Sequence, residues 1–290
     1  MQVLVAGGTG MLGVPVVRHL VHLGHQVRVL TRSPAEARRR LGESVQTVQG
    51  DVKDRSTLDA AVAGCDALHV TLRGADDWMD YEAVENHGLR ALLDASCGAG
   101  LRHVTYLSGA GRMYGCEQIP AVAIKLAAEQ AIRECGLAFT IFRATHFMES
   151  LDLFISKHTA TIIGRQPHRY HYLAASDFAH LIAQSLLNQD AFGRTFYAFG
   201  PQALTMREAL ERYRGILDPS LRITQLPIAV ARLIGTVGQN RRLRFAASLF
   251  EGFALIGEEG DPEECQRILG KPQTTLDEWL RGRASRVRAA

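Results

Sequence analysis

The stretch Gly7-Gly8-Thr9-Gly10-Met11-Leu12-Gly13 lies between a short apolar run, residues 3–6, and a segment with helical spacing of apolar residues that begins at Val14. A strand, a glycine turn and a helix in this order are the context of a dinucleotide-binding fingerprint. Gly7 permits the tight turn, Gly10 lets the backbone approach a pyrophosphate, and Gly13 lets helix and strand pack closely. Free N–H groups at the start of the helix would hold the phosphates. The expected contacts from this stretch are Gly7, Thr9, Gly10, Met11, Leu12 and Gly13.

Composition places the chain among ordinary globular proteins. Of its 290 residues, 47% are hydrophobic and 22% are charged, as is usual for this class. The net charge of +3 is too small to indicate a nucleic-acid partner. The five cysteines are widely spaced and form no Cys-x-x-Cys pair, which fits a reducing compartment. Because strand residues begin at Gln2, we expect no signal peptide and predict a cytoplasmic protein without a transmembrane segment.

Strands and helices alternate along the first half of the chain. This alternation implies parallel pairing and right-handed crossovers, and so predicts an α/β fold with one doubly wound parallel (Rossmann) sheet. After Arg143 the pattern fails, and residues 145–168 read as loop and short helix. The predicted strands are residues 3–6, 27–31, 45–49, 66–72, 103–108 and 138–143, with a late strand at 195–199. The predicted organisation is a dinucleotide-binding domain over 1–200 with an excursion at 145–168, a mostly helical lobe over 201–280, and a basic tail, 281–290, that frays.

The residues after the second strand predict which dinucleotide is bound. Arg32 and Ser33 occupy the place where an NAD site usually holds an acidic residue, and an arginine there suits a 2′-phosphate. A solvated surface arginine is the alternative, since residues 38–40 of the next helix are also arginines. Because no Asp or Glu takes the competing position, the sequence predicts NADP, with NAD as the weaker candidate.

Two other strand ends add candidate cofactor contacts, because open α/β sheets bind ligands at the carboxyl ends of their strands. Asp51 could accept a hydrogen bond from an adenine amino group. Its alternative role is that of a helix-capping or turn carboxylate. The expected contacts at these two ends are Asp51 and Val52, then Thr71, Leu72 and Arg73.

Further motifs complete a family pattern: Leu107-Ser108, Lys125-Leu126-Ala127-Ala128-Glu129, Phe142-Arg143 and Phe147-Met148-Glu149. With them, the chain resembles the short-chain dehydrogenase/reductase superfamily, and most closely its atypical, NmrA-like branch of NAD(P)-binding proteins. The resemblance is close over residues 1–149 and looser through Phe199. It implies a parallel sheet of about seven strands and a smaller C-terminal substrate lobe. It also implies a nicotinamide near Ser108 and Lys125, with His146 close to nicotinamide and substrate or serving only as a structural histidine.

The resemblance also implies a catalytic pair that this chain lacks. Active members of the superfamily use a tyrosine four residues before the lysine, and Ala121 stands there. A methyl group transfers no proton. Lys125 could itself be the acid or base if burial lowered its pKa, or it could bind only the ribose. Tyr114, on the glycine-rich loop, could donate the proton, or it could be a loop aromatic packed on the sheet edge.

Two functions follow from these residues. The first is an NADPH-dependent oxidoreductase acting on a small apolar carbonyl or enone-like substrate. The second is a non-catalytic NADP-binding regulator, such as a redox sensor, or an assembly subunit of a larger complex that binds a protein partner. His168 and His171 lack the carboxylate spacing of a metal site, and we expect no metal. Residues 241–257 begin with arginines and continue as an apolar helix, which reads as a membrane-surface or docking helix or as a cover for the substrate pocket.

Overall fold

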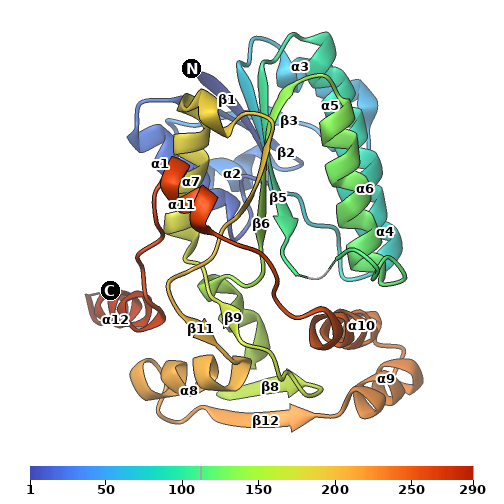
Figure 1. Cartoon of the computed structure of the whole chain (residues 1–290), viewed down its shortest axis with the longest axis vertical. Helices are drawn as coiled ribbons and strands as arrows, with labels where there is room; N and C mark the ends of the chain where they lie inside the picture. Colours follow the sequence, from blue (N-terminus) through green and yellow to red (C-terminus); the bar gives the residue numbers. More distant parts are fainter. Residues whose placement is uncertain (112, 290) are drawn as a thin grey trace.

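The computed structural model describes residues 1–111 and 113–289. Its main body is a seven-stranded sheet in the order β10-β6-β5-β4-β1-β2-β3, with every neighbouring pair parallel. Helices α1 and α7 cover one face and α5 and α6 the other (Figure 1), which confirms the doubly wound sheet. The chain crosses from one side of β1 to the other between β3 and β4, and such a switch point opens a crevice at the carboxyl ends of the strands. The strands are β1 (Gln2–Ala6), β2 (Gln26–Thr31), β3 (Gln46–Gln49), β4 (Ala67–Val70), β5 (His103–Gly109), β6 (Ala138–Ala144) and β10 (Arg194–Tyr197).

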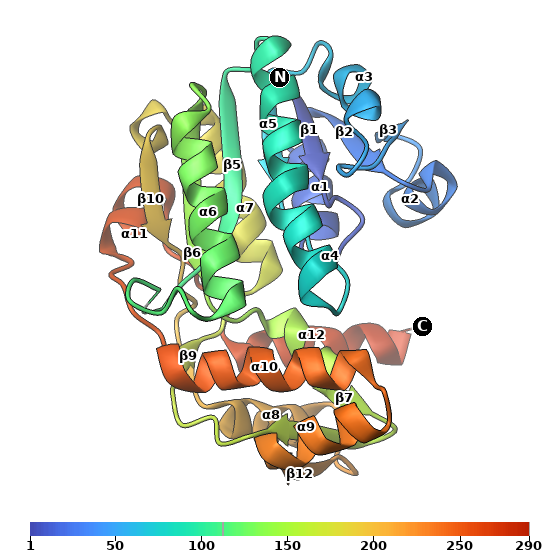
Figure 2. The ribbon, with the colours of Figure 1, turned by 90° about the vertical axis from the view of Figure 1, so that its right-hand side faces the viewer.

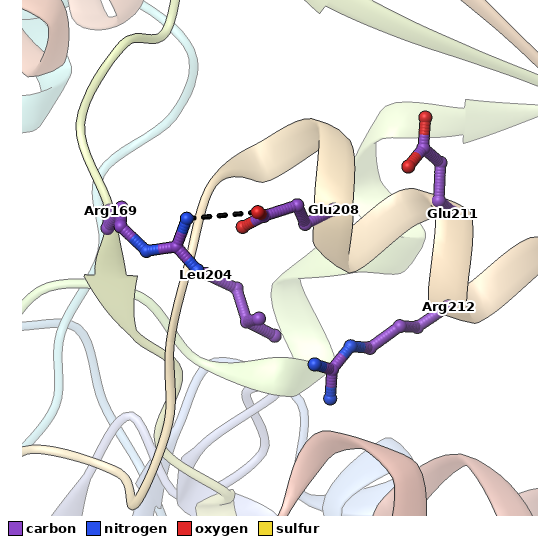
Figure 3. Close-up of a pocket in the computed structure, with 5 residues that line it drawn as sticks. All are labelled: Arg169, Leu204, Glu208, Glu211 and Arg212. Atoms are coloured by element: carbon purple, nitrogen blue, oxygen red, sulfur yellow. Dashed lines mark hydrogen bonds and ion pairs between the residues drawn. The ribbon is translucent and has the colours of Figure 1, made fainter.

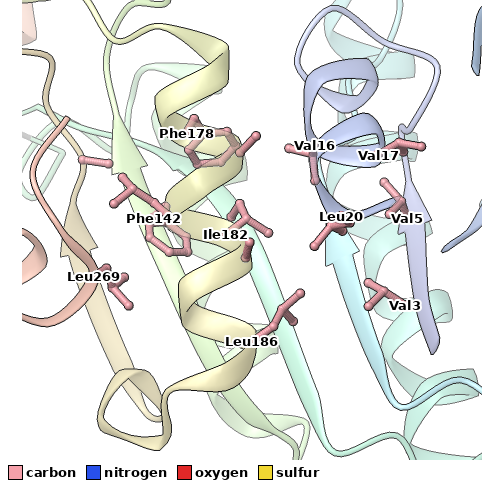
Figure 4. Packing of buried hydrophobic residues seen from close by; sticks show 14 of the residues in the cluster. Val3, Val5, Val16, Val17, Leu20, Phe142, Phe178, Ile182, Leu186 and Leu269 are labelled. Carbon is pink, nitrogen blue, oxygen red and sulfur yellow. The ribbon is translucent and has the colours of Figure 1, made fainter. Parts of the chain in front are cut away.

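Strand β1 reads as a continuous apolar run because both of its faces are buried. Val3 and Val5 pack with α1 and α7, whereas Leu4 and Ala6 belong to the cluster on the opposite side of the sheet. Figure 4 shows Val3 and Val5 beside the apolar side chains of α1, facing those of α7. The sheet is therefore held between two separate apolar layers.

The helices of this body largely follow the expected pattern, with one difference. The helical segment between β4 and β5 is interrupted by a π-helical turn, Ala83–Gly88, which joins α4 to α5. Apolar periodicity does not report such a turn, because it adds a single residue to the helix. The helices are α1 (Gly13–His22), α2 (Pro34–Leu41), α3 (Leu58–Val62), α4 (Trp78–Glu82), α5 (Leu89–Gly98), α6 (Pro120–Glu134) and α7 (Ala175–Leu187).

The second lobe is built on a small sheet that the sequence analysis missed. Strand β8 (Thr159–Ile163) pairs in parallel with β12 (Arg222–Leu226) and antiparallel with β7 (Ile155–Ser156). Residues 145–168 are therefore not simply loop and short helix; they supply part of this lobe. Strand β12 is largely exposed and leaves no apolar run that would mark it as the partner of β8. The other elements are a 3₁₀ turn (Met148–Phe154), β9 (Tyr170–His171), β11 (Ala203–Leu204), α8 (Met206–Ile216), α9 (Ile228–Val237), α10 (Arg241–Ile256), α11 (Glu263–Leu269) and α12 (Leu276–Ala289). Short 3₁₀ turns also occur at Arg55–Thr57 and Gln189–Ala191.

The C-terminal region is helical. Residues 281–289, which belong to the predicted basic tail, continue helix α12, and this helix buries Leu276 and Leu280 nearer its start. The apolar side of α10 faces inward, since Phe245 and Phe250 are buried and Phe250 belongs to the core of the second lobe. Residues 245–257 thus serve as a cover within the molecule. None of the helices described here has the length and apolarity needed to cross a lipid bilayer.

Candidate functional site

A cleft of about 530 Å³ lies over the carboxyl ends of the central strands, where the topology places a ligand. Most of the cofactor contacts expected from the sequence line this one cleft. They are Gly7, Thr9, Gly10, Arg32, Ser33, Asp51, Val52, Thr71, Leu72 and Arg73.

The glycine turn forms one side of the cleft and admits no side chain at two positions. Gly7 has φ +88°, and a Cβ there would lie 2.2 Å from the Thr71 carbonyl oxygen. A Cβ on Gly13 would lie 2.1 Å from the Gly7 carbonyl oxygen. Because these positions carry no side chain, the turn packs closely and its backbone lines the cleft, where a pyrophosphate could approach it. Of the other predicted contacts, Leu12 packs against the core and Met11 lines a separate hollow beside α12.

Positive charge gathers at the end of the cleft formed by β2 and α2. Arg32 and Ser33 line it as predicted, and Arg40 joins them from α2. The Arg40 side chain donates through Nη1 to the Thr9 carbonyl oxygen at 3.1 Å and through Nε to Glu36 at 2.7 Å. The sequence analysis treated Arg40 as a surface arginine, although its i+4 spacing from Glu36 places both on one side of α2. The glycine turn and the arginines together fit the phosphates of a dinucleotide.

Asp51 combines both roles considered for it. Its Oδ1 accepts a hydrogen bond from the Lys53 backbone N–H at 3.0 Å, which makes it a turn carboxylate, and the residue also lines the cleft. Asp80 lines the same wall, where it pairs with Lys53 at 2.9 Å. Asp80 and Val84 were not predicted, because residues 74–84 carry no motif and reach the cleft only through the packing of α4.

Lys125, on helix α6, is largely buried and ion-paired. Its Nζ lies 2.6 Å from Glu85 Oε2 and donates to Tyr106 Oη and to the Leu107 carbonyl oxygen, both at 3.3 Å. Glu85 is buried and lies on the π-helical turn, directly after Val84 of the cleft wall. Glu85 was not among the predicted site residues. A glutamate in the middle of a helix carries no signal of a partner forty residues away.

A role of Lys125 as an acid or base depended on a lowered pKa, but its surroundings shift this pKa in the opposite direction. Burial acts to lower the pKa of Lys125, but the Glu85 carboxylate, Tyr106 and Tyr81 outweigh it and raise this pKa well above its usual value. Burial also raises the pKa of Tyr106 to about 12. Lys125 is thus an ammonium at neutral pH, and the pKa lowered by burial on which its role as an acid or base depended is not found.

Ser108 belongs to a second polar cluster. Its hydroxyl donates to Glu129 Oε1 at 2.7 Å, and Glu129 also accepts from Arg143 Nη2 at 2.7 Å. Burial acts to raise the pKa of Glu129, but the hydrogen bonds from Arg143 and Ser108 lower it below its usual value. Tyr114 is 65% exposed, and its Oη accepts from Arg143 Nη2 at 3.2 Å. Tyr114 therefore lies on the loop beside this ion pair, as expected of a loop aromatic at the edge of the sheet.

His146 follows β6 and is enclosed by aromatic rings. It stacks on Tyr172 at 5.5 Å between ring centroids and meets Tyr170 and Phe253 edge-on at 4.5 and 5.0 Å. Burial lowers its pKa to about 4, so the ring is neutral at physiological pH. This environment fits the structural reading of His146 and shows that α10, through Phe253, closes over the end of β6.

A larger hollow of about 820 Å³ adjoins the cleft between α4 and α10. Asp80 lines both spaces, so they meet at this residue. Trp78 and Phe245 form an aromatic wall, with ring centroids 4.5 Å apart, and Lys53, Arg241 and Arg244 lie around them. The hollow offers an apolar surface next to the cofactor cleft, which suits a small apolar molecule.

A third hollow lies at the start of α8, away from the glycine turn. Figure 3 shows Arg169 reaching across it to Glu208, with the two side chains 2.9 Å apart. Glu208 also completes a capping box with Thr205, so its carboxylate is engaged in capping the start of α8. The hollow measures about 350 Å³ and is lined by Arg169, Leu204, Glu208, Glu211 and Arg212. No residue predicted for the site lies in it.

Comparison with known proteins agrees with this fold. The chain is 26% identical over 297 residues to the NAD(P)H azoreductase of Xenophilus azovorans, with 100% of both chains covered. It is 26% identical over 303 residues to the photosystem II assembly factor Ycf39 of Synechocystis sp., covering 99% of this chain and 92% of that one. The NADPH complex of the quinone oxidoreductase QOR2 from Escherichia coli superposes with a TM-score of 0.75 at 19% identity, covering 96% and 98% of the two chains, and shows a shared fold. A family model described as the NmrA-like family matches residues 1–280, and the chain therefore belongs to this family.

Proposed function

We propose that this protein is an NADPH-dependent oxidoreductase that reduces a small apolar carbonyl or enone-like substrate without a Tyr-x-x-x-Lys pair. The observation that carries the proposal is the arrangement of the site. A glycine-lined cleft has arginines at one end and shares Asp80 with an aromatic hollow, and Glu85 of the Lys125–Glu85 pair is the residue after Val84 of the cleft wall. The azoreductase relative, which covers the whole chain, supports the same class of reaction. The free cysteines fit a cytoplasmic location.

Each part of the cleft has a role in this proposal. The glycine turn and the start of α1 would hold the pyrophosphate, Arg32 and Arg40 the 2′-phosphate, and Asp51 the adenine. Bound NADPH supplies a hydride. Trp78 and Phe245 would hold the apolar substrate and exclude water from it.

Lys125 acts as a fixed ammonium in this scheme. Its raised pKa keeps the proton on Nζ, so it does not act as a base. Its three N–H bonds face Glu85, Tyr106 and Leu107, so a ribose hydroxyl or a substrate oxygen would replace one of the two contacts at 3.3 Å. Glu85 fixes the position of Nζ. Tyr114 is the second group that could donate a proton, through movement of its exposed loop.

The alternative is a non-catalytic NADP-binding regulator or an accessory subunit for the assembly of a complex. Ala121 favours it, because the position of the usual proton donor carries a methyl group. The photosystem II assembly factor relative also favours it, because that protein matches nearly all of this chain.

Steady-state oxidation of NADPH with a panel of azo dyes, quinones and enones separates the two functions. We expect turnover with at least one class, and its loss in Lys125→Met while calorimetry still detects bound NADPH. Lys271→Met, which removes an exposed lysine far along the chain, is the matched control and should keep full activity. Tight NADPH binding with no turnover across the panel would contradict the oxidoreductase and support the regulator.

A further inference from the structure

Helix α9 carries an apolar stripe that faces away from the protein. Val230, Leu233, Ile234 and Val237 follow the i, i+3, i+4, i+7 spacing of one helix side. Their exposed fractions are 40%, 63%, 49% and 77%. The buried residues of the same helix, Ala231 and Gly235, lie on another side. An unbroken apolar stripe at the surface of a folded chain marks an interaction site.

The position of α9 leaves this stripe accessible. Figures 1 and 2 show α9 at the end of the molecule away from the seven-stranded sheet, with α10 between α9 and the main body. Gly235 packs against α10 so closely that a Cβ would lie 2.8 Å from Arg244 Cγ. Contact with α10 thus fixes which side of α9 is buried and turns the α9 stripe outward.

All charged residues in the segment that contains the α9 stripe are arginines. Residues 219–250 contain five arginines and no aspartate, glutamate or lysine. Arg232 pairs with Glu251 on α10, and Arg242 pairs with Asp76 at 2.7 Å. The other three, Arg222, Arg241 and Arg244, are exposed. Arg241 follows the end of the stripe by four residues, so the chain carries positive charge at the start of α10, directly after the apolar helix.

We propose that α9 docks on an anionic phospholipid bilayer, with the α9 stripe inserted among the acyl chains and the exposed arginines at the headgroups. An apolar helix side bordered by arginines is the pattern of helices that lie in the membrane interface. Anionic lipids attract such arginines. A second copy of this chain is a poorer occupant, because a symmetric contact would bring the same arginines together. The proposal is independent of the oxidoreductase activity.

Flotation of the full-length protein with lipid vesicles tests the proposal. We expect binding to vesicles of phosphatidylcholine mixed with phosphatidylglycerol, and much weaker binding to phosphatidylcholine alone. Leu233→Ser combined with Val237→Ser should lower the partition coefficient more than about tenfold. Arg241→Gln combined with Arg244→Gln should lower it by about fivefold for each arginine, and added salt should reduce the difference.

Matched control variants show whether a loss of vesicle binding is specific to the α9 stripe and its neighbouring arginines. Leu187 is 63% exposed, as Leu233 is, but lies at the end of α7, so Leu187→Ser should bind vesicles like the parent. Arg207→Gln with Arg214→Gln removes the same charge from the exposed side of α8 and should also leave binding unchanged. Sedimentation velocity in the absence of lipid shows whether a second copy of this chain binds the α9 stripe instead. Undiminished vesicle binding by the Leu233/Val237 variant, or a dimer that this variant dissociates, would overturn the proposal.

Discussion

Glu36 determines how much positive charge the cleft offers to a phosphate. It accepts from Arg40 Nε at 2.7 Å and from Arg39 Nη2 at 2.5 Å, and these two arginines lower its pKa. Arg40 is thereby held with one nitrogen on a carboxylate and another on the Thr9 carbonyl oxygen. Arg32 has neither restraint, so it is the freer of the two arginines to follow a ligand.

The first prediction concerns these two arginines. Arg32→Ala and Arg40→Ala should each weaken NADPH binding by about 10- to 150-fold, because a hydrogen bond to a charged group contributes about 1.5–3 kcal/mol. The affinity for NADH, which has no 2′-phosphate, should change little. Isothermal titration calorimetry with both nucleotides measures this, with exposed Arg38→Ala on the same helix as control. Equal affinity of the parent for NADH and NADPH would show that neither arginine reads the phosphate.

The second prediction concerns the buried ion pair. Glu85→Gln leaves the Lys125 ammonium without its carboxylate, and removal of one partner from a buried pair costs about 3–5 kcal/mol of folding free energy. Urea unfolding at neutral pH measures the loss. Asp59→Asn makes the same chemical change in the exposed Arg55–Asp59 pair and should cost less than about 1 kcal/mol. The double variant Glu85→Leu, Lys125→Met removes both charges, so it should be more stable than Glu85→Gln alone. If it is not, the pair is not the source of the loss.

At the scale of elements, the glycine turn, β1 and α1 form one unit. A Cβ on Gly13 would clash with the Gly7 carbonyl oxygen, and a Cβ on Gly7 would clash with the Thr71 carbonyl oxygen just after β4. The helix start, the turn and two strands therefore meet within van der Waals contact. A change at Gly13 acts on the cleft through the position of α1, since Gly13 itself does not line the cleft.

The third prediction tests this unit. Gly13→Ala places a methyl group 2.1 Å from a backbone oxygen that cannot move aside, so α1 must shift and NADPH affinity should fall more than about tenfold. Gly98→Ala is the control, since Gly98 ends α5 with open space around its Cβ position, and this change should be neutral or stabilise by up to about 1 kcal/mol. Calorimetry and thermal unfolding follow both variants. Unchanged NADPH affinity in Gly13→Ala would contradict the role given to close packing.

The elements also show which parts of the molecule could be predicted. The strands of the main sheet are buried on both faces, so each leaves an apolar run, and the order of strands and helices then determines the sheet. Strand β8 escaped prediction because its partner β12 is largely exposed and leaves no apolar run. In the site, Arg32 and Thr71 were predictable from strand ends. Arg40 and Asp80 were not, because only helix packing brings them to the cleft. Glu85 was not predictable either, because only helix packing brings it to Lys125.

Across the whole molecule, three buried histidines lie in the central strands or just beyond them. His69 Nδ1 meets Thr105 Oγ1 at 2.8 Å, and His103 Nε2 meets Thr140 Oγ1 at 3.0 Å. Burial lowers the pKa of His69 to about 3 and that of His103 to about 4, and that of His146 is lowered equally. All three are neutral in the folded protein, and each gains a proton on unfolding below its ordinary pKa of about 6.5. Acid therefore favours the unfolded chain.

The last prediction is a loss of stability on mild acidification. Below about pH 6.5 the unfolded chain binds more protons than the folded one, so stability falls with pH until the folded histidines titrate near pH 4. At about 1.4 kcal/mol per histidine and pH unit, the loss between about pH 7.5 and 5.5 amounts to up to about 4 kcal/mol. Carboxylates with lowered pKa, such as Glu129, lose their contribution only in stronger acid. Glu149, whose pKa burial raises, opposes the loss. Urea unfolding at the two pH values measures the loss of stability. The variant His103→Gln removes one titrating ring and should reduce this loss by about a third. Equal stability at both pH values would mean that these histidines are already accessible to protons in the folded state.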